Sequence, residues 1–220
     1  MVKILSYKKT LIVVMLIAIA VIAVIKIMDE NRLNSLSKDV RATTFESEST
    51  RLLFLYAQVI GSESKEKLCN ALDFNTKRQM NKGYYLVNAL KAYEDANLLA
   101  DYEETRKVYY LSNVELWLYS TQSKNVCNQS QIVPILFFHE TKTRCADCIV
   151  QGQILDVVRS KCTNLRVISL ATDQELDIID LIKNQFGVTY TPSLVINNEI
   201  VLNGLQNEES ILNNIVCVKE

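Results

Sequence analysis

The sequence predicts a chain of three parts: an N-terminal transmembrane helix, an α-helical bundle, and a C-terminal α/β domain of order β-α-β-α-β-β-α. Three observations predict this organisation. Fifteen apolar residues run without interruption from position 11 to position 25. Residues 49–126 contain no Pro and repeat apolar residues at helical spacing. After Cys127, short apolar runs alternate with helical patterns, which is typical of parallel strands joined by helices.

Composition restricts the classes of function. The 220 residues are 49% hydrophobic and 22% charged, which excludes a disordered chain and allows a buried core. Lys and Arg number 24 against 25 Asp and Glu, so the net charge of −1 offers no general attraction for the phosphates of nucleic acid. We therefore expect no nucleic-acid partner. The single His excludes a multi-histidine metal centre, and the six Cys allow three pairs.

Residues 10–28 are expected to be an uncleaved transmembrane anchor. The apolar run has Lys26 as its only charge and is long enough to cross a bilayer, which needs about 20 residues. A cleaved signal peptide is one alternative, because lysines precede the apolar centre. The run ends in charged residues, however, which make a poor cleavage site. A buried helix of a soluble protein is the other alternative, but the run shows no amphipathic pattern.

The next two segments differ from the anchor in composition. Residues 29–48 are polar and rich in Ser and Thr, and they are interpreted as a juxtamembrane linker or a solvated helix. Residues 49–128 are expected to form a small antiparallel helical domain, with a break at Gly61 and Ser62. This part holds eight of the ten Tyr and the only Trp, Trp117. Such a stripe of aromatic residues is more typical of a core than of a ligand site.

The α/β part is predicted element by element. Its expected strands cover 132–138, 165–170, 193–196 and 199–202, and its expected helices cover 148–161, 173–186 and 206–216. Asp173 is a candidate N-cap of the second helix, and Gly187 a candidate stop. Asn197 and Asn198 between the last two strands predict a β-hairpin.

Cys145 and Cys148 carry the chemistry that the sequence indicates. The pair lies between a strand and a helix, so one thiol falls at the helix N-terminus and the other within the first turn. Unpaired N–H groups and the helix dipole favour a thiolate there. Arg144 should favour it further, whereas Asp147 should oppose it. Cys145 would attack and Cys148 would resolve the mixed disulfide, storing two electrons without a cofactor. CxxC alone is also half of a zinc site.

A second signal accompanies the cysteine pair. Thr191-Pro192 follows a helix and opens the predicted hairpin, at a place where Pro can adopt a cis bond. A CxxC at the start of a helix and a Thr-Pro loop of this kind resemble the thioredoxin-like superfamily over residues 131–217. The resemblance implies a thioredoxin-like fold in which Pro192 faces the cysteines. It also implies that Thr191 and Pro192 shape the substrate groove and that Thr191 contacts the substrate backbone.

Three positions depart from the family pattern. Arg144 replaces a Trp, Ala146 and Asp147 replace Gly-Pro, and the buried acidic residue that transfers protons in some thioredoxins has no clear match. His139 and Glu140 lie near that place. His139 is therefore interpreted either as a proton shuttle or as an ordinary histidine at a strand end.

The family topology also suggests partners for the other cysteines. It places the CxxC helix and the final helix on one face of the sheet, with Cys162 and Cys217 at their ends, so we expect a disulfide between these two residues. Cys69 and Cys127 are the remaining pair, and they bracket the helical bundle. A disulfide closing a loop of that size contributes about 4 kcal/mol in the chain-entropy model. The alternative is four buried free thiols.

The leading functional hypothesis is a membrane-tethered thiol–disulfide oxidoreductase. Its partners would be thiols and disulfides of exported proteins, or a membrane redox relay. A non-catalytic thioredoxin-like binding or assembly module at the membrane surface is the second hypothesis. Copper delivery is the third, although that subfamily typically uses CxxxC with a distant His, and no His follows Cys148. The direction of electron flow stays open, because Arg144 and Asp147 act in opposite senses.

The expected location of the C-terminal domains follows from the cysteines rather than from the charges that flank the anchor. Lysines and arginines flank the anchor on both sides, so the positive-inside rule does not orient it. Paired cysteines are typical of compartments outside the cytosol. We therefore expect a single-pass protein with a cytoplasmic tail at 1–9 and extracytoplasmic C-terminal domains. Asn128-Gln129-Ser130 has the form of a glycosylation sequon.

Overall fold

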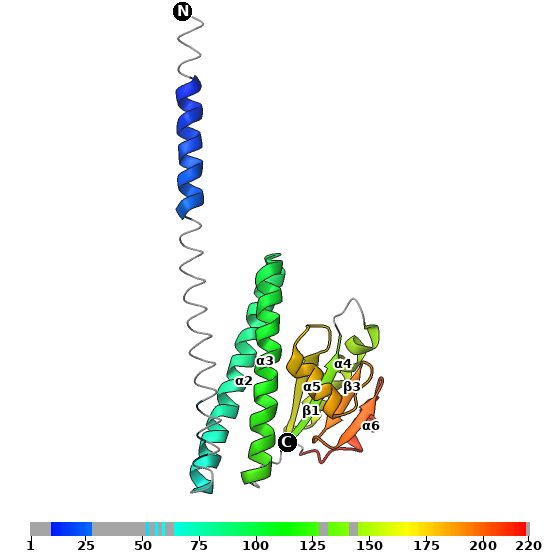
Figure 1. Cartoon of the computed structure of the whole chain (residues 1–220). Helices are drawn as coiled ribbons and strands as arrows, with labels where there is room; N and C mark the ends of the chain where they lie inside the picture. Colours follow the sequence, from blue (N-terminus) through cyan, green and yellow to red (C-terminus); the bar gives the residue numbers. More distant parts are fainter. Residues whose placement is uncertain are drawn as a thin grey trace, which may run out of the picture. The chain divides into compact units, whose positions relative to one another are not determined.

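The structure is a computed structural model of the whole chain, and it describes residues 10–27, 52, 56, 59, 64–127, 132–140 and 145–218 (Figure 1). The chain divides into two compact units, residues 1–60 and residues 61–220. The cytoplasmic tail at 1–9, the linker at 29–48, Arg144 and the sequon at Asn128 all lie outside the described residues. What the sequence predicts for these residues stays a prediction.

The first unit contains the N-terminal helix. Residues Thr10–Ile27 form a helix that is long and apolar enough to cross a membrane, and all its side chains are exposed. Exposed Ile, Val and Leu in such number would be unfavourable in water, because each adds apolar surface to the solvent. Leu52, Tyr56 and Val59 are also helical and exposed.

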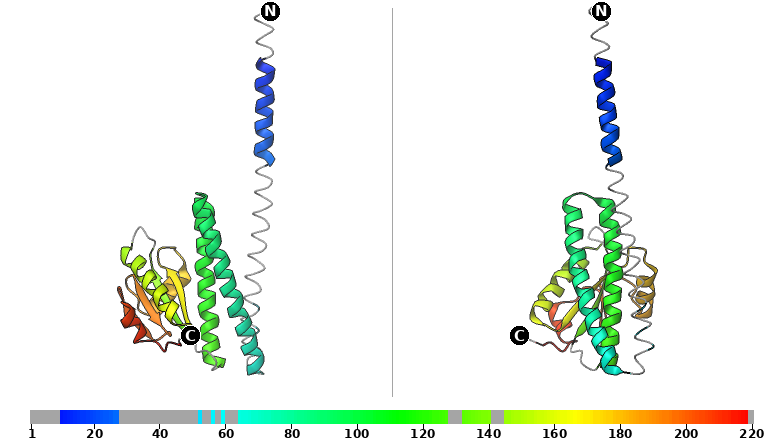
Figure 2. Two further views of the ribbon diagram at one scale, coloured as in Figure 1. Left: turned by 180° about the vertical axis from the view of Figure 1, so that it is seen from behind. Right: turned by 90° about the vertical axis from the view of Figure 1, so that its left-hand side faces the viewer.

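The second unit begins with a long helical hairpin. Helix α2 covers Lys65–Asp95 and helix α3 covers Leu99–Cys127, and Figure 2 shows them side by side and antiparallel. Ser64 caps α2, since its hydroxyl accepts a hydrogen bond from the N–H of Lys67. The connection turns at Asn97, which has a φ of 53° as an αL residue after a helix does. Within the predicted helical domain, residues 65–127 thus form two long helices and their short connection.

The α/β part contains a four-stranded mixed sheet of order β2-β1-β3-β4. Its strands are β1 (Val133–His139), β2 (Leu165–Ala171), β3 (Ser193–Ile196) and β4 (Ile200–Asn203). β1 pairs in parallel with β2 and antiparallel with β3, and β3 pairs antiparallel with β4. The helices are α4 (Ala146–Lys161), α5 (Asp177–Gln185) and α6 (Glu208–Leu212). The central strands β1 and β3 are buried on both faces, which explains why they read as continuous apolar runs.

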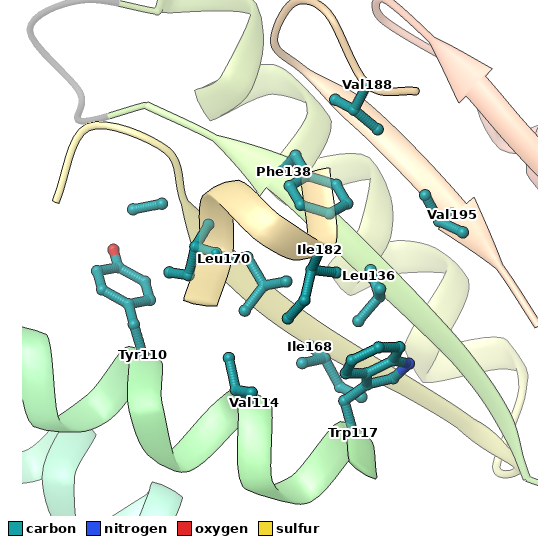
Figure 3. Packing of buried hydrophobic residues seen from close by; sticks show 12 residues of the cluster. Tyr110, Val114, Trp117, Leu136, Phe138, Ile168, Leu170, Ile182, Val188 and Val195 are labelled. Atoms are coloured by element: carbon teal, nitrogen blue, oxygen red, sulfur yellow. The ribbon is translucent and has the colours of Figure 1, made fainter. Parts of the chain in front are cut away.

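Alternate side chains of the strands enter two cores. Even-numbered residues of β1, such as Leu136 and Phe138, pack against α3 and α5 (Figure 3). Odd-numbered residues, such as Ile135 and Phe137, pack with buried side chains of α4 and α6. Large side chains are fully enclosed in both cores, among them Phe138 in the first and Leu155 in the second.

Helix α3 packs against the sheet as well as against α2. Its Tyr110, Val114 and Trp117 pack in the same core as β1 and β2 (Figure 3). The buried side chains of α2 are partly apolar, such as Leu72, and partly polar, and Ser112 of α3 donates a hydrogen bond of 3.1 Å to Gln79 of α2. The prediction that the aromatic residues of this part form a core is confirmed at Tyr110 and Trp117, which pack with the strands, and at Tyr119. It is wrong at three exposed residues, Tyr56, Tyr84 and Tyr85. The helical hairpin and the α/β elements therefore share one hydrophobic core.

Helix α5 begins later than predicted. The prediction of a start at Asp173 is wrong, because α5 covers Asp177–Gln185 with Leu176 as its N-cap. The chain first makes a turn after β2, in which Glu175 has a φ of 53°. Gln174 is buried there, and its amide oxygen accepts a hydrogen bond of 3.0 Å from Nε of Arg106 on α3. This contact holds the turn, so the helix starts after it and ends as predicted before Gly187.

Helix α6 is shorter than the predicted 206–216. It covers Glu208–Leu212 and begins at Asn207, whose side chain caps the N–H of Ser210. The chain beyond it bonds elsewhere: the carbonyl of Val218 accepts from the N–H of Thr163, and that of Val216 accepts from the amide of Asn164. These hydrogen bonds to the α4–β2 connection replace those of further helical turns.

Candidate active site

The N-terminus of α4 positions the two cysteines of the CxxC motif. Helix α4 starts at Ala146, two residues before the predicted start, with Cys145 as its N-cap in an extended conformation. Cys148 lies in the first turn, and a disulfide joins the two sulfurs with a Cα–Cα distance of 5.3 Å. Sγ of Cys145 accepts a hydrogen bond of 3.1 Å from the N–H of Cys148. The cysteine thus takes the capping role that Ser or Asp usually fills.

This geometry favours a thiolate at Cys145 after reduction. The N–H of Cys148 already points at the sulfur, and the partial positive charge of the helix N-terminus adds to its effect. Asp147 is exposed in the same turn and places a negative charge beside the sulfurs. Both cysteines are buried in the bridged form, at 9% and 5% exposure.

The Thr191–Pro192 loop lies at the same end of the sheet. Pro192 follows a cis peptide bond and directly precedes β3. Because Ser193 pairs with Phe138, the loop reaches the carboxyl end of β1, the strand that leads to α4. Thr191 donates a hydrogen bond of 3.2 Å from Oγ1 to Oε1 of Glu140. Leu194, two residues after Pro192, shares a core with Cys145 and Cys148.

His139 closes the carboxyl end of β1 and has both ring nitrogens engaged. Its Nδ1 lies 3.0 Å from the carbonyl of Glu140, which can only accept, so Nδ1 carries the hydrogen. Its Nε2 lies 2.6 Å from Oγ of Ser169 and accepts from that hydroxyl. Burial lowers the pKa of His139, although the bond to the Glu140 carbonyl acts in the opposite direction. These contacts favour the interpretation as an ordinary strand-end histidine.

The other four cysteines form two disulfides away from the CxxC. Cys69 of α2 bonds to Cys127 at the end of α3, with a Cα–Cα distance of 5.6 Å, and closes the open end of the hairpin. Cys162 at the end of α4 bonds to Cys217, with a Cα–Cα distance of 5.1 Å. These are the pairs proposed from the sequence. Cys217 lies five residues beyond α6 rather than at its last turn, because α6 ends at Leu212.

Sequence reasoning missed the contribution of the helical hairpin to this region. A groove beside Cys148 is walled on one side by α4 and the end of β1, and on the other by residues near the α2–α3 connection, including Glu94 and Glu103. No local motif marks these residues, since they reach the site only because α3 packs on the sheet. Within the described ranges, no three His, Cys, Asp or Glu side chains gather as metal ligands would.

Comparison with known proteins finds a similarity for the C-terminal part of the chain. Residues 138–216 match the family model of a thioredoxin domain. The match includes both cysteines of the CxxC motif as well as Thr191 and Pro192. No curated protein and no solved structure matches the chain significantly.

Proposed function

Because its C-terminal domain is thioredoxin-like, we propose that this protein is a membrane-tethered thiol–disulfide oxidoreductase that works through Cys145 and Cys148. The observation that carries the proposal is the position of Cys145 as the N-cap of α4, with its sulfur hydrogen-bonded to the N–H of Cys148. A sulfur in that place has a stabilised thiolate, which is the nucleophilic form.

The exchange balances without a cofactor. In the reducing direction, the Cys145 thiolate attacks one sulfur of a client disulfide, forms a mixed disulfide and releases the other client sulfur as a thiolate. The Cys148 thiolate then attacks Sγ of Cys145, forms the intramolecular disulfide and releases the second client thiolate. The client gains two electrons and the CxxC pair loses two. In the oxidising direction the same steps run in reverse.

The proposal also includes a membrane tether and a location outside the cytosol. The helix Thr10–Ile27 has the length and composition of a membrane span, and it would hold the redox domain at the membrane surface. Two further disulfides outside the CxxC motif support an oxidising compartment. We propose an orientation with the N-terminus in the cytoplasm, so that the clients are exported proteins or a membrane redox partner.

Trapping and turnover test this function. The full chain in a neutral detergent, supplied with dithiothreitol, should reduce the disulfides of insulin faster than dithiothreitol alone. Cys148→Ser should accumulate a mixed disulfide with insulin at Cys145, because the resolving thiol is missing. Cys145→Ser is the matched control and should trap much less. Equal insulin reduction by the wild type and the Cys145→Ser, Cys148→Ser double variant would contradict the proposal.

One observation favours the second candidate, a non-catalytic binding module. Cys145 is only 9% exposed in the bridged form, and a nucleophile must meet its client. The two functions differ in thiol reactivity after mild reduction. An oxidoreductase should react with iodoacetamide at Cys145 within minutes near neutral pH, because thiolate is present. A binding module with an inert pair should remain unmodified while still folded.

A further inference from the structure

The groove beside Cys148 has one wall that lies outside the thioredoxin-like part of the chain. It has a volume of about 700 Å³. One wall consists of Cys148, Gly152, Asp156 and their neighbours on one face of α4, with His139 and Glu140 at the end of β1. The opposite wall comes from the helical hairpin, which contributes Glu94 at the end of α2 and Tyr102, Glu103, Arg106 and Tyr110 of α3.

The described lining of this groove carries more acidic than basic side chains, whereas the charge of the whole chain is only −1. Among the residues that the structure describes, the lining holds the four carboxylates of Glu94, Glu103, Glu140 and Asp156 and the guanidinium of Arg106, a formal charge of −3. The guanidinium of Arg106 is engaged in contacts within the protein. Arg106 bonds to Glu103 and to Gln174, and it lies 5.4 Å from the centre of the Tyr102 ring. Arg159, next to the lining, also lies 3.9 Å from Asp156, so the excess of negative charge that the lining presents to an incoming chain comes mainly from Glu94 and Glu140.

The groove also offers apolar contact near the sulfur. Ile149 follows Cys148 in the lining and is 41% exposed. Tyr102 on the opposite wall presents a ring. A client segment lying between these walls would place aliphatic or aromatic side chains against Ile149 and Tyr102 and its charged side chains against the carboxylates.

From these features we infer that the helical hairpin selects clients, and that the groove takes a cationic peptide segment whose cysteine is flanked by Lys or Arg. This inference rests on the proposed function and adds the substrate class. Opposite charge on the two partners raises the rate of encounter and disfavours acidic clients, which would meet like charge. Anionic low-molecular-weight disulfides would be disfavoured for the same reason.

The test compares matched substrates on the full chain in neutral detergent. Two peptides of equal length each contain one intramolecular disulfide, flanked by Lys in one and by Glu in the other. Bis(2-hydroxyethyl) disulfide serves as a small neutral reference. At low ionic strength we expect kcat/KM for the Lys peptide to exceed that for the Glu peptide by about tenfold or more, and the ratio to shrink as salt is added.

Two double variants then distinguish an effect of the groove from an effect of the overall charge of the protein. Glu94→Lys with Glu103→Gln changes the groove wall. Asp95→Lys with Glu104→Gln makes the same change of charge at the neighbouring positions, which do not line the groove. We expect the first pair to lower the ratio between the Lys and Glu peptides several-fold, and the second pair to leave it near the wild-type value. Asp156→Lys on the opposite wall should also lower it, and replaces the first pair if that pair fails to fold.

The outcomes separate the two proposals. Wild-type protein that fails to reduce even the neutral disulfide would overturn the proposed function. Reduction of the neutral disulfide with equal kcat/KM for the Lys and Glu peptides would overturn only the client preference. An equal loss of preference in both double variants would also overturn it, because the effect would then come from overall charge rather than from the groove.

Discussion

Nε1 of Trp117 on α3 donates a hydrogen bond of 2.7 Å to Oδ1 of Asn198, 81 residues further along the chain. Asn198 lies in the turn between β3 and β4 with a φ of 64°, and its amide donates in turn to Oγ1 of Thr121. A single turn residue thus holds two positions of α3. Together with the packing of Trp117 in the sheet core, it fixes the helical hairpin to the thioredoxin-like elements.

This relationship predicts that Asn198→Gly destabilises the protein. Gly keeps the positive φ of the turn but removes both hydrogen bonds to α3, and each is worth about 1 kcal/mol. We expect the free energy of unfolding to fall by about 1–2 kcal/mol, measured by urea unfolding of the full chain in detergent through the fluorescence of Trp117, the only Trp. Asn197→Gly is the control, since Asn197 makes only a 3.3 Å contact with Lys124. A smaller loss at position 198 than at 197 would contradict the role given to Asn198.

The disulfide between Cys69 and Cys127 predicts a large effect on stability. It joins residues 58 positions apart, and the chain-entropy model assigns a loop of that length about 4 kcal/mol. Cys69→Ser with Cys127→Ser should lower the urea midpoint accordingly. Cys145→Ser with Cys148→Ser should lower it by less than half as much, because that disulfide spans only 3 positions. Mapping of the unreduced protein that found free thiols at 69 and 127 would remove the basis of this prediction.

The lowered pKa of His139 predicts that the stability of the oxidised protein depends on pH. Burial lowers the pKa of His139 in the folded state, so the unfolded chain binds the proton more readily. Stability should be fully present above the unfolded pKa of about 6.5 and should fall as the pH drops below it, by at most about 1.4 kcal/mol per pH unit. His139 is the only histidine, so His139→Gln should flatten the dependence between pH 7.5 and 5.5. An unchanged slope in that variant would assign the effect to other groups.

Asp147 predicts a shift of the reduction potential. Its exposed carboxylate lies in the first turn of α4, where it opposes a thiolate at Cys145. A charge near a helix N-terminus is worth about 0.3–1 kcal/mol, and 1.4 kcal/mol corresponds to about 30 mV for a dithiol pair. Asp147→Asn should therefore raise the potential by on the order of 10 mV, measured by redox equilibration with glutathione. Glu209→Gln, which removes an exposed charge from α6, should leave it unchanged. A lower potential in Asp147→Asn would contradict the electrostatic argument.

Much of the α/β part was predictable because its signals are local. The buried strands read as apolar runs, the Asn197-Asn198 turn has the positive φ values that a tight hairpin requires, and Gly187 stops α5 with a φ of 65°. The sequence-based predictions were wrong at the ends of two helices. The start of α5 depends on Gln174 bonding to Arg106, and the end of α6 depends on hydrogen bonds to Thr163 and Asn164. These partners are distant in sequence, so no local pattern contains them.

The sequence by itself determined where the residues proposed for the chemistry lie: the spacing of Cys145 and Cys148 at a helix start, and a Pro at the entry of a strand, are properties of short segments. Only the tertiary structure decided what surrounds that chemistry. The sequence indicated the apolar face of α3 but not the element that covers it. Helical spacing predicts that one face of a helix is buried, but it does not predict which other element packs against that face. Its packing on β1 and β2 is what brings Glu94 and Glu103 to the groove beside Cys148.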